Sequence, residues 1–325
     1  MSENLNRREF VKATTLAASG LLAAAQAATA APQPAVAPRS MGARFRALMN
    51  GPEPLICPGA FDILSARLCA LHGFNGAFIG SSVINQAFAG LPDQAIVTVS
   101  EIVEYDSVIA SNVDIPVLAD VDDFGATPLD VYRFAKQAER GGIGCAAFDD
   151  RLPMNRATNY AVPGPMPVAR MIDNIHAAAD ARTDMVIIAR CLAPDRAEML
   201  DRAAAYAEAG ADAIWLGLPT PQDYARAAGM IRKPLMAGVG NARIPATAEA
   251  MKAARITVGQ AVTMVNIALG GVDRALAELK TTGRMSEAQR AALSRETSEK
   301  IEQVEQLNAR SRKYNLPGGG SPAER

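Results

Sequence analysis

Acidic residues follow two successive apolar segments of the chain, at the point where each segment ends. Asp120, Asp122 and Asp123 end the first segment, and Asp149 and Asp150 end the second. The residues between the segments have helical periodicity, which predicts two parallel strands joined by a right-handed helical crossover. The carboxyl ends of such strands are where α/β folds bind their ligands. We therefore expect up to five carboxylates to meet in one small volume.

Carboxylates that lie this close together repel one another unless a cation lies among them. Their oxygen atoms favour a hard divalent ion, so Mg²⁺ or Mn²⁺ is the expected cofactor. The alternative is that these acids cap helices or face solvent. That alternative explains any one of them well, but it does not explain why two successive segments both end in an acidic cluster. The pattern favours a metal site.

The composition argues against several other kinds of chemistry. The only histidines, His72 and His176, belong to predicted helices, which argues against zinc-histidine sites and Ser-His or Cys-His triads. A net charge of -1 gives no basic surface for nucleic acid. Four cysteines are too few for a disulfide scaffold, although one disulfide stays open. Carboxylates, arginine, hydroxyls and a metal must therefore carry the chemistry.

Short apolar runs alternate with amphipathic helices through most of the chain. The helices repeatedly end in glycine before the next run, at Gly73, Gly142 and Gly210. The predicted strands span residues 55–59, 76–80, 116–121, 144–148, 185–189, 213–217, 234–238 and 256–259. The predicted helices span 41–49, 63–71, 101–111, 129–140, 168–179, 196–209, 222–230 and 247–254. Alternation of this kind predicts a (β/α)8 TIM barrel. An open doubly wound sheet is the alternative, but no Gly-x-Gly-x-x-Gly loop follows any strand.

The N-terminus has the features of an export signal. Residues 1–31 carry paired arginines at Arg7 and Arg8, an Ala/Leu-rich run and Ala-x-Ala steps, a pattern typical of the twin-arginine pathway. The run is too short to span a bilayer, so no membrane contact is expected after signal removal. Export predicts a periplasmic protein, whereas a protein that keeps a basic, disordered N-terminus would be cytoplasmic. Residues 32–43 form a predicted linker and 44–283 the catalytic barrel.

Further helices are predicted after the last strand. Residues 261–282 form a long helix, and 284–312 form a C-terminal helix that Ser286 caps. A helix beyond the closed barrel has no place in the barrel wall. It therefore packs either on another subunit or as a clasp on its own chain. Residues 313–325 are expected to be disordered.

Five short motifs occur in order along the chain: Cys57-Pro58-Gly59-Ala60-Phe61-Asp62, Gly80-Ser81-Ser82, Gly90-Leu91-Pro92-Asp93, Ala119-Asp120-Val121-Asp122 and Ala189-Arg190. Together they resemble the isocitrate lyase and phosphoenolpyruvate mutase superfamily over residues 44–283. The resemblance implies a TIM barrel with a Mg²⁺ site. It also implies a homo-dimer or homo-tetramer in which a final helix is exchanged between subunits.

The resemblance also implies roles for the acids and for one arginine. Asp120 is similar to the acid that binds Mg²⁺ directly. Asp93, Asp122 and Asp149 are similar to acids that hold metal-bound waters, although glutamate is usual at the last of these positions. Arg190 is similar to the arginine that grips the carboxylate or phosphonate of the substrate.

The remaining implied roles concern hydroxyls and a loop. Ser81 and Ser82 match the loop that cradles a 2-oxo acid, and Asn155 belongs to a Pro- and Gly-rich stretch of the kind that forms a mobile lid over substrate. Arg190, Ser81 and Asp93 are the residues expected to act in catalysis.

Three departures from the family pattern place the chain in a divergent branch. The lyases carry a catalytic cysteine in a loop after the fourth strand, and residues 153–158 at that place hold no thiol. The family's Asp-Thr-Gly-Tyr-Gly is one residue short here, and Cys191-Leu192 replaces the usual Thr-Asp. Cleavage of isocitrate or 2-methylisocitrate by a cysteine base is therefore disfavoured.

The leading hypothesis is a Mg²⁺-dependent lyase that acts on a small 2-oxo or 2-hydroxy dicarboxylate. Oxaloacetate decarboxylation is the simplest reaction that fits, because loss of CO₂ from a chelated 2-oxo acid needs no cysteine and passes through an enolate that a divalent cation stabilises. One alternative is phosphonopyruvate hydrolysis or the mutase reaction. Another is a catalytically idle barrel that binds a carboxylate ligand.

Overall fold

Strands and helices alternate along the chain in the structure, a computed structural model that describes residues 40–94, 96–125, 127–152, 164–261, 264–314 and 316. The strands are β1 (Leu55–Pro58), β2 (Ala77–Ile79), β3 (Val117–Asp120), β4 (Cys145–Asp149), β5 (Val186–Arg190), β6 (Ala213–Trp215), β7 (Leu235–Val239) and β8 (Val258–Ala261). The helices up to the last strand are α2 (Met41–Met49), α3 (Ile63–Leu71), α4 (Ser81–Ala87), α5 (Val99–Ala110), α6 (Pro128–Arg140), α7 (Val168–Ala181), α8 (Arg196–Glu208), α9 (Pro221–Met230) and α10 (Ala248–Ala253).

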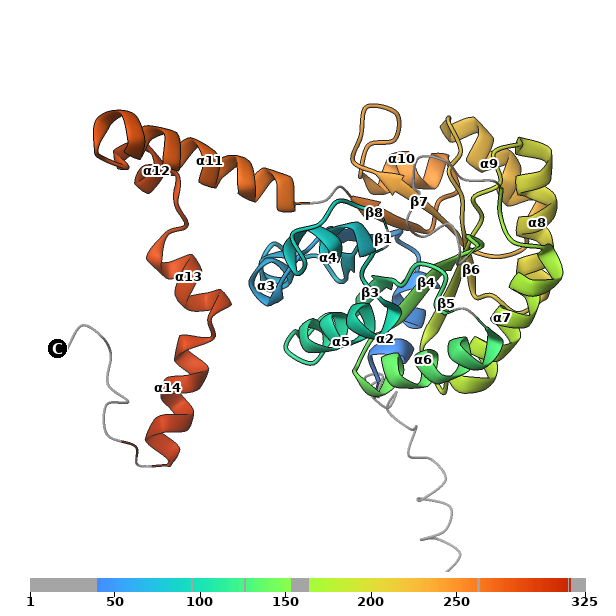
Figure 1. The fold of residues 1–325 in the computed structure, drawn as a ribbon, viewed down its shortest axis with the longest axis horizontal. Helices are drawn as coiled ribbons and strands as arrows, with labels where there is room; N and C mark the ends of the chain where they lie inside the picture. Colours follow the sequence, from blue (N-terminus) through green and yellow to red (C-terminus); the bar gives the residue numbers. More distant parts are fainter. Residues whose placement is uncertain are drawn as a thin grey trace, which may run out of the picture. The chain divides into compact units, whose positions relative to one another are not determined.

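The eight strands form one parallel sheet that curls into a barrel, with the helices outside it (Figure 1). Their order around the sheet is β1-β8-β7-β6-β5-β4-β3-β2, and every paired neighbour runs parallel. A parallel bridge between Gly59 and Phe78 joins the two outer strands. The predicted TIM barrel is confirmed, and the open doubly wound sheet is wrong.

The glycines after three helices take the backbone conformation that the sequence predicts. Gly73, Gly142 and Gly210 have φ of 83°, 89° and 107°, a region that other L residues rarely adopt. The residue after each glycine donates its N–H back to the last helical turn, as Ile143 does to the carbonyl of Ala138. These turns end α3, α6 and α8 and start the next connection to the sheet. The repeated turn keeps successive strands parallel.

The core has two layers, one inside the barrel and one between the strands and the helices. The inner layer includes Cys57, Leu118, Cys145 and Ile188. Phe45 of α2 packs into the same layer and is fully buried. All four cysteines are buried and free, so the disulfide that the sequence left open is absent. Among the described residues, none of the helices has the length and apolar content needed to cross a membrane.

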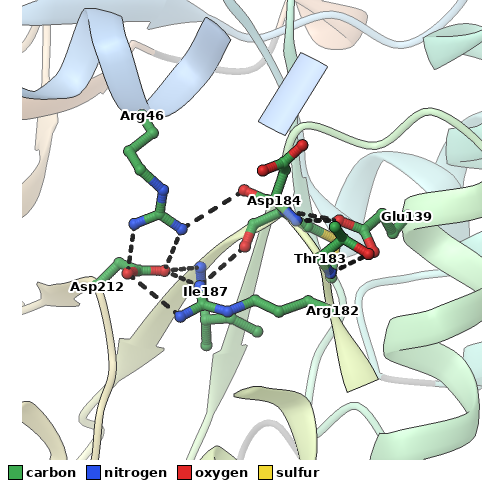
Figure 2. A network of polar contacts seen from close by, with 8 residues as sticks. Arg46, Glu139, Arg182, Thr183, Asp184, Ile187 and Asp212 are labelled. Carbon is green, nitrogen blue, oxygen red and sulfur yellow. Dashed lines mark hydrogen bonds and ion pairs between the residues drawn. The ribbon is translucent and has the colours of Figure 1, made fainter. Parts of the chain in front are cut away.

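A network of charges ties α2 to the amino-terminal end of the barrel (Figure 2). The carboxylate of Asp212, directly before β6, accepts hydrogen bonds from Arg46 at 2.6 Å, from Arg182 and from the N–H of Ile187 at 2.9 Å. Glu139 of α6 caps the backbone before β5 and accepts the N–H of Asp184 at 2.6 Å. Burial opposes ionisation of Asp212, but the two guanidiniums outweigh it and lower its pKa. The charges at this end of the barrel therefore stabilise the fold and do not form a ligand site.

The segment after β8 differs from the sequence prediction. The helix predicted from residue 261 begins later, as α11 (Val265–Thr282). The single C-terminal helix predicted over 284–312 is wrong, because it divides into α12 (Ser286–Ala291), α13 (Arg295–Ile301) and α14 (Val304–Lys313). Ser294 starts a new helix by accepting the N–H of Thr297, and Gln303 at φ 57° interrupts the next turn. Met285, not Ser286, is the N-cap of α12.

Other differences are smaller. The seven-residue helix α4 was not predicted, and the linker proposed to run to residue 43 ends earlier, because α2 begins at Met41. The predicted export signal, most of the linker, the Asn155 loop and most of the C-terminal tail lie outside the described residues.

Replacing Asp212 with Asn should lower the free energy of unfolding at neutral pH by about 2–3 kcal/mol, because two partly buried guanidiniums lose their counter-charge. The lowered pKa means that the contribution of Asp212 is present above its unfolded pKa and is lost as the pH falls through the folded value. Denaturant unfolding should therefore show a difference from wild type that shrinks in acid. Asp114→Asn, an exposed carboxylate, is the control. Equal stability of wild type and D212N at neutral pH would contradict this role.

Candidate active site

A pocket of about 270 Å³ lies at the carboxyl ends of the strands. Residues at or just after the ends of β2, β3, β5, β6, β7 and β8 line it. A second hollow of about 580 Å³ lies at the opposite end, beside the residues that precede β1, β7 and β8. We place the active site in the smaller pocket, because it brings acidic side chains opposite arginine at the end where barrel enzymes bind substrate.

Three of the predicted metal acids lie together beneath this pocket. Asp120 ends β3, Asp149 ends β4, and Asp122 follows β3 at φ 51°; their exposed fractions are 6%, 0% and 3%. The N–H of Asp149 donates to the carbonyl of Asp122 at 2.7 Å, which ties the two strand ends together. Burial raises the pKa of Asp120 to about 7; Arg190 opposes the rise, and the carboxylates of Asp122 and Asp149 add to it.

The other two acids of the clusters do not face the pocket. Asp150 accepts hydrogen bonds from the hydroxyl of Tyr206 and the N–H of Leu192, both at 2.8 Å. Asp123 accepts the N–H of Gly125 at 3.0 Å and holds the turn after β3. Neighbouring side chains at a strand end point to opposite faces, which is why Asp149 and Asp150 separate. Up to five carboxylates were expected to meet in one volume, and the structure brings together three of them, those of Asp120, Asp122 and Asp149.

Arg190 lies beside the acids in the lining of the pocket. It ends β5, in register with Asp149 on β4, and its Nη1 lies 3.6 Å from Oδ2 of Asp120. Its guanidinium stacks on the ring of Trp215, 4.0 Å from the ring centre, and Phe78 packs edge-on against that ring. The stack fixes the plane of the guanidinium, so its free edge is oriented before a carboxylate arrives.

The predicted hydroxyl and rim residues also reach the pocket. Ser81 and Ser82 line it from the first turn of α4, directly after β2, and Asp93 lies exposed at its edge. Asn155, predicted to contact substrate, lies outside the described residues. Of the suggested residues, the pocket is lined by Ser81, Ser82, Asp93, Asp120 and Arg190, and the buried Asp122 and Asp149 act electrostatically on Asp120.

Four residues of the pocket lining with a polar group in the side chain were not predicted from the sequence. Trp215 is the only tryptophan of the chain, and Arg151 lies two residues after Asp149. Asn241 and Gln260 contribute amide groups from the loop after β7 and from β8. Applying the strand-end rule to all eight predicted strands, rather than to the acidic ones alone, would have found Gln260, whereas Trp215 lies in the middle of its predicted strand.

The acids fit a divalent ion of one particular kind. Within the part of the chain that the structure describes, no group of three or more His, Cys, Asp or Glu side chains converges closely enough to surround a metal. Yet Oδ1 of Asp120 and Oδ2 of Asp149 are buried and accept no hydrogen bond from any described residue. Buried carboxylate oxygens without donors need a cation or water. This donor set suits a Mg²⁺ ion that keeps several waters and takes one or two carboxylates.

Comparison with known proteins decides the family. Residues 45–280 match the family described as phosphoenolpyruvate phosphomutase. The chain belongs to this family. It is an enzyme of the phosphoenolpyruvate mutase and isocitrate lyase superfamily, and the relatives that it resembles include lyases.

The most similar relatives carry several different activities. A probable 2-methylisocitrate lyase 2 from Corynebacterium glutamicum is 29% identical over 77% of this chain and 84% of that protein. The oxaloacetate decarboxylase of Chromohalobacter salexigens is 34% identical over 53% of this chain and 61% of that protein. Phosphonopyruvate hydrolase, solved with oxalate and Mg²⁺, is 26% identical at a TM-score of 0.73, covering 85% and 99% of the two chains.

A further solved structure supports the fold alone. Oxaloacetate acetylhydrolase in complex with 3,3-difluorooxalacetate has a TM-score of 0.77 at 22% identity, over 87% of this chain and all of that one.

Asp120→Asn should stabilise the metal-free protein at about pH 8. The folded pKa of Asp120, about 7, lies above its unfolded value, so between about pH 4 and 7 the native state holds a proton that the unfolded state has lost, and at about pH 8 the buried carboxylate is charged. Wild-type stability should therefore fall as the pH rises from about 4 to 7, and the variant should not share this loss.

Denaturant unfolding in EDTA at about pH 5 and about pH 8 measures the effect. The advantage of D120N should be larger at the higher pH. Asp173→Asn on the exposed face of α7 is the control. A D120N protein that is less stable than wild type at about pH 8 would contradict the assignment of Asp120 as a buried acid without a hydrogen-bonded partner.

Proposed function

We propose that this enzyme is a Mg²⁺-dependent lyase that removes CO₂ from a small 2-oxo dicarboxylate, with oxaloacetate as the candidate substrate. The observation that carries the proposal is the pairing of Asp120 with Arg190, whose charged atoms lie 3.6 Å apart in the lining of a pocket of about 270 Å³. A pocket of this size that carries both a metal-binding carboxylate and a stacked guanidinium suits a small, acidic substrate. Similarity to oxaloacetate decarboxylases supports the same choice.

Asp120 would hold the metal directly, and Asp122, Asp149 and Asp93 would hold its waters. When bound, Mg²⁺ supplies a positive charge that stabilises the oxygen of the 2-oxo group as the carbon-carbon bond breaks. Mn²⁺ has the same donor preference and should replace it.

Arg190 would bind and orient the substrate carboxylate. A guanidinium presents two parallel N–H groups to a carboxylate, which fixes the plane of the substrate as well as its position. Trp215 holds that guanidinium flat, so little rotational freedom is lost when substrate binds. The hydroxyls of Ser81 and Ser82 lie where they can donate to the carboxylate and 2-oxo oxygens.

Decarboxylation leaves an electron pair on the carbon that loses CO₂, and the resulting enolate takes up a proton there. The indole of Trp215 and the ring of Phe78 exclude water from one wall of the pocket, and this strengthens the electrostatic contacts inside it. No base is needed to start this step.

The thiols argue against cysteine-based cleavage. Cys191, directly after Arg190, is the cysteine nearest in sequence to a site residue, and burial raises its pKa to about 12. A thiol with that pKa stays protonated near neutral pH and is a poor base. Residues 153–158 also hold no cysteine. We therefore favour decarboxylation over cleavage of 2-methylisocitrate.

Hydrolysis of phosphonopyruvate is the second candidate, because it too needs a metal, an arginine and no thiol. Similarity to phosphonopyruvate hydrolase supports it. Membership of an enzyme family argues against the other alternative, an idle barrel that binds a carboxylate.

We also propose a homo-dimer or homo-tetramer and a periplasmic location. Ile267, Val272, Leu276 and Leu279 of α11 are between 41% and 64% exposed, which supports a role for this helix in assembly. The paired arginines near the N-terminus support export. No nucleic acid or membrane partner is proposed.

Oxaloacetate turnover should need Mg²⁺ or Mn²⁺ and should fall at least about a hundredfold in Asp120→Asn, because the ion loses its carboxylate. Arg190→Lys should lower kcat/KM by about tenfold or more, because an ammonium cannot make the planar fork.

The rate of pyruvate formation measures both the metal requirement and the effects of the two substitutions, after EDTA treatment and again after metal is added back. Asp114→Asn and Arg226→Lys, both exposed, are the controls. Full activity in EDTA would contradict the proposal.

Ser82→Glu should abolish turnover, because a third carboxyl-bearing side chain at the pocket wall repels an acidic substrate. Ser82→Ala should keep at least about a tenth of the activity, since it removes only one hydrogen bond. Steady-state kinetics of the two variants on oxaloacetate give the comparison. Equal activities of S82E and S82A would show that substrate binds elsewhere.

A further inference from the structure

A second guanidinium, that of Arg151, lies inside the acidic cluster. Its Nη2 is 3.3 Å from Oδ2 of Asp149, and its backbone N–H donates to Oδ1 of the same carboxylate at 3.1 Å. The Arg151 side chain is 13% exposed and the Asp149 side chain is fully buried. Arg151 also lines the pocket beside Asp120 and Asp93. It is therefore part of the proposed metal site and not a surface charge.

The electrostatics of Arg151 involve the whole cluster. Burial lowers its pKa, but Asp149, Asp122, Asp120 and Asp93 outweigh this and raise it. Arginine stays charged under all working conditions. It is thus a permanent positive charge among the four carboxylates that are expected to bind the metal and its waters.

The contact with Asp149 is one that an ion can displace. Oδ2 of Asp149 lies within ion-pair distance of Arg151 but accepts no hydrogen bond from any described residue. Charge alone holds this oxygen to the guanidinium, so a metal-bound water that donates a hydrogen bond to it can take the place of Arg151. Arg190 is different, because stacking on Trp215 fixes it in place.

We propose that Arg151 is an internal counter-cation: it neutralises the acidic cluster when no metal is bound and competes with the divalent ion for Asp149. This inference rests on the proposed Mg²⁺ site. Arg151 therefore weakens metal binding. It also stabilises the folded metal-free protein, because its positive charge offsets the repulsion between the carboxylates. The residue is a positioning residue that acts through Asp149 and the metal.

The test is the affinity for Mn²⁺ of metal-free wild type, Arg151→Gln and Arg151→Lys, measured by electron paramagnetic resonance of the free ion. R151Q should bind Mn²⁺ at least about tenfold more tightly than wild type, because a like charge next to the ion is gone. R151K keeps the charge and should bind within about threefold of wild type. A role of side-chain shape alone would move R151Q and R151K together.

Thermal unfolding gives a second readout. In EDTA, R151Q should melt below wild type and R151K, and saturating Mn²⁺ should remove the difference. An R151Q protein that folds only with Mn²⁺ supports the inference, because the ion then replaces the guanidinium. An R151Q protein that binds Mn²⁺ no more tightly than wild type, or that fails to fold with and without the ion, overturns it.

The outcome separates from that of the proposed function. Wild type that binds Mn²⁺ but leaves oxaloacetate unchanged contradicts the decarboxylase proposal and leaves the competition between Arg151 and the ion measurable. If wild type turns over oxaloacetate and R151Q binds Mn²⁺ with the same affinity as wild type, only the role of Arg151 is contradicted. Failure of all three proteins to bind Mn²⁺ overturns both.

Discussion

The site depends on the register of three parallel strands. β3, β4 and β5 pair so that Asp120, Asp149 and Arg190 end their strands at one edge of the barrel, with Asp149 directly opposite Arg190. A shift of one residue in either pairing would turn an acid or the guanidinium to the outer face. The two-layer core therefore does more than stabilise the chain, because it holds the alignment that brings opposite charges to one pocket.

The two ends of the barrel carry charges in opposite ways. At the amino-terminal end, Asp212 is satisfied by two arginines and a backbone N–H. At the carboxyl end, Oδ1 of Asp120 and Oδ2 of Asp149 are buried and accept no hydrogen bond from any described residue, although each carboxylate lies within ion-pair distance of an arginine. Unsatisfied buried carboxylates destabilise a fold, and enzymes tolerate them where a ligand completes the site. The closed network at one end offsets part of the cost at the other.

Much of this arrangement was predictable from the sequence. All eight strands lie within three residues of their predicted bounds, because periodicity and the helix-ending glycines are local signals. The C-terminal segment was not predictable in the same way, since helix interruption at Ser294 and Gln303 depends on capping that a sparse apolar stripe does not reveal. Within the site, position at a strand end predicted Asp120 and Asp149, and the family resemblance predicted Arg190. The sequence could not separate Asp149 from Asp150, whose side chains face opposite ways, nor identify the stack of Arg190 on Trp215, which joins two strands.

Asp120 and Arg190 are expected to bind a divalent ion and an acidic ligand next to each other at the carboxyl end of the barrel. A crystal structure of the mature protein grown with Mn²⁺ and oxalate tests this expectation most directly, since anomalous scattering locates the ion. The account predicts one Mn²⁺ at about 2.2 Å from a carboxylate oxygen of Asp120, with oxalate bound to both the ion and the Arg190 guanidinium. An ion bound at another place, or an oxalate that leaves Arg190 untouched, would contradict it.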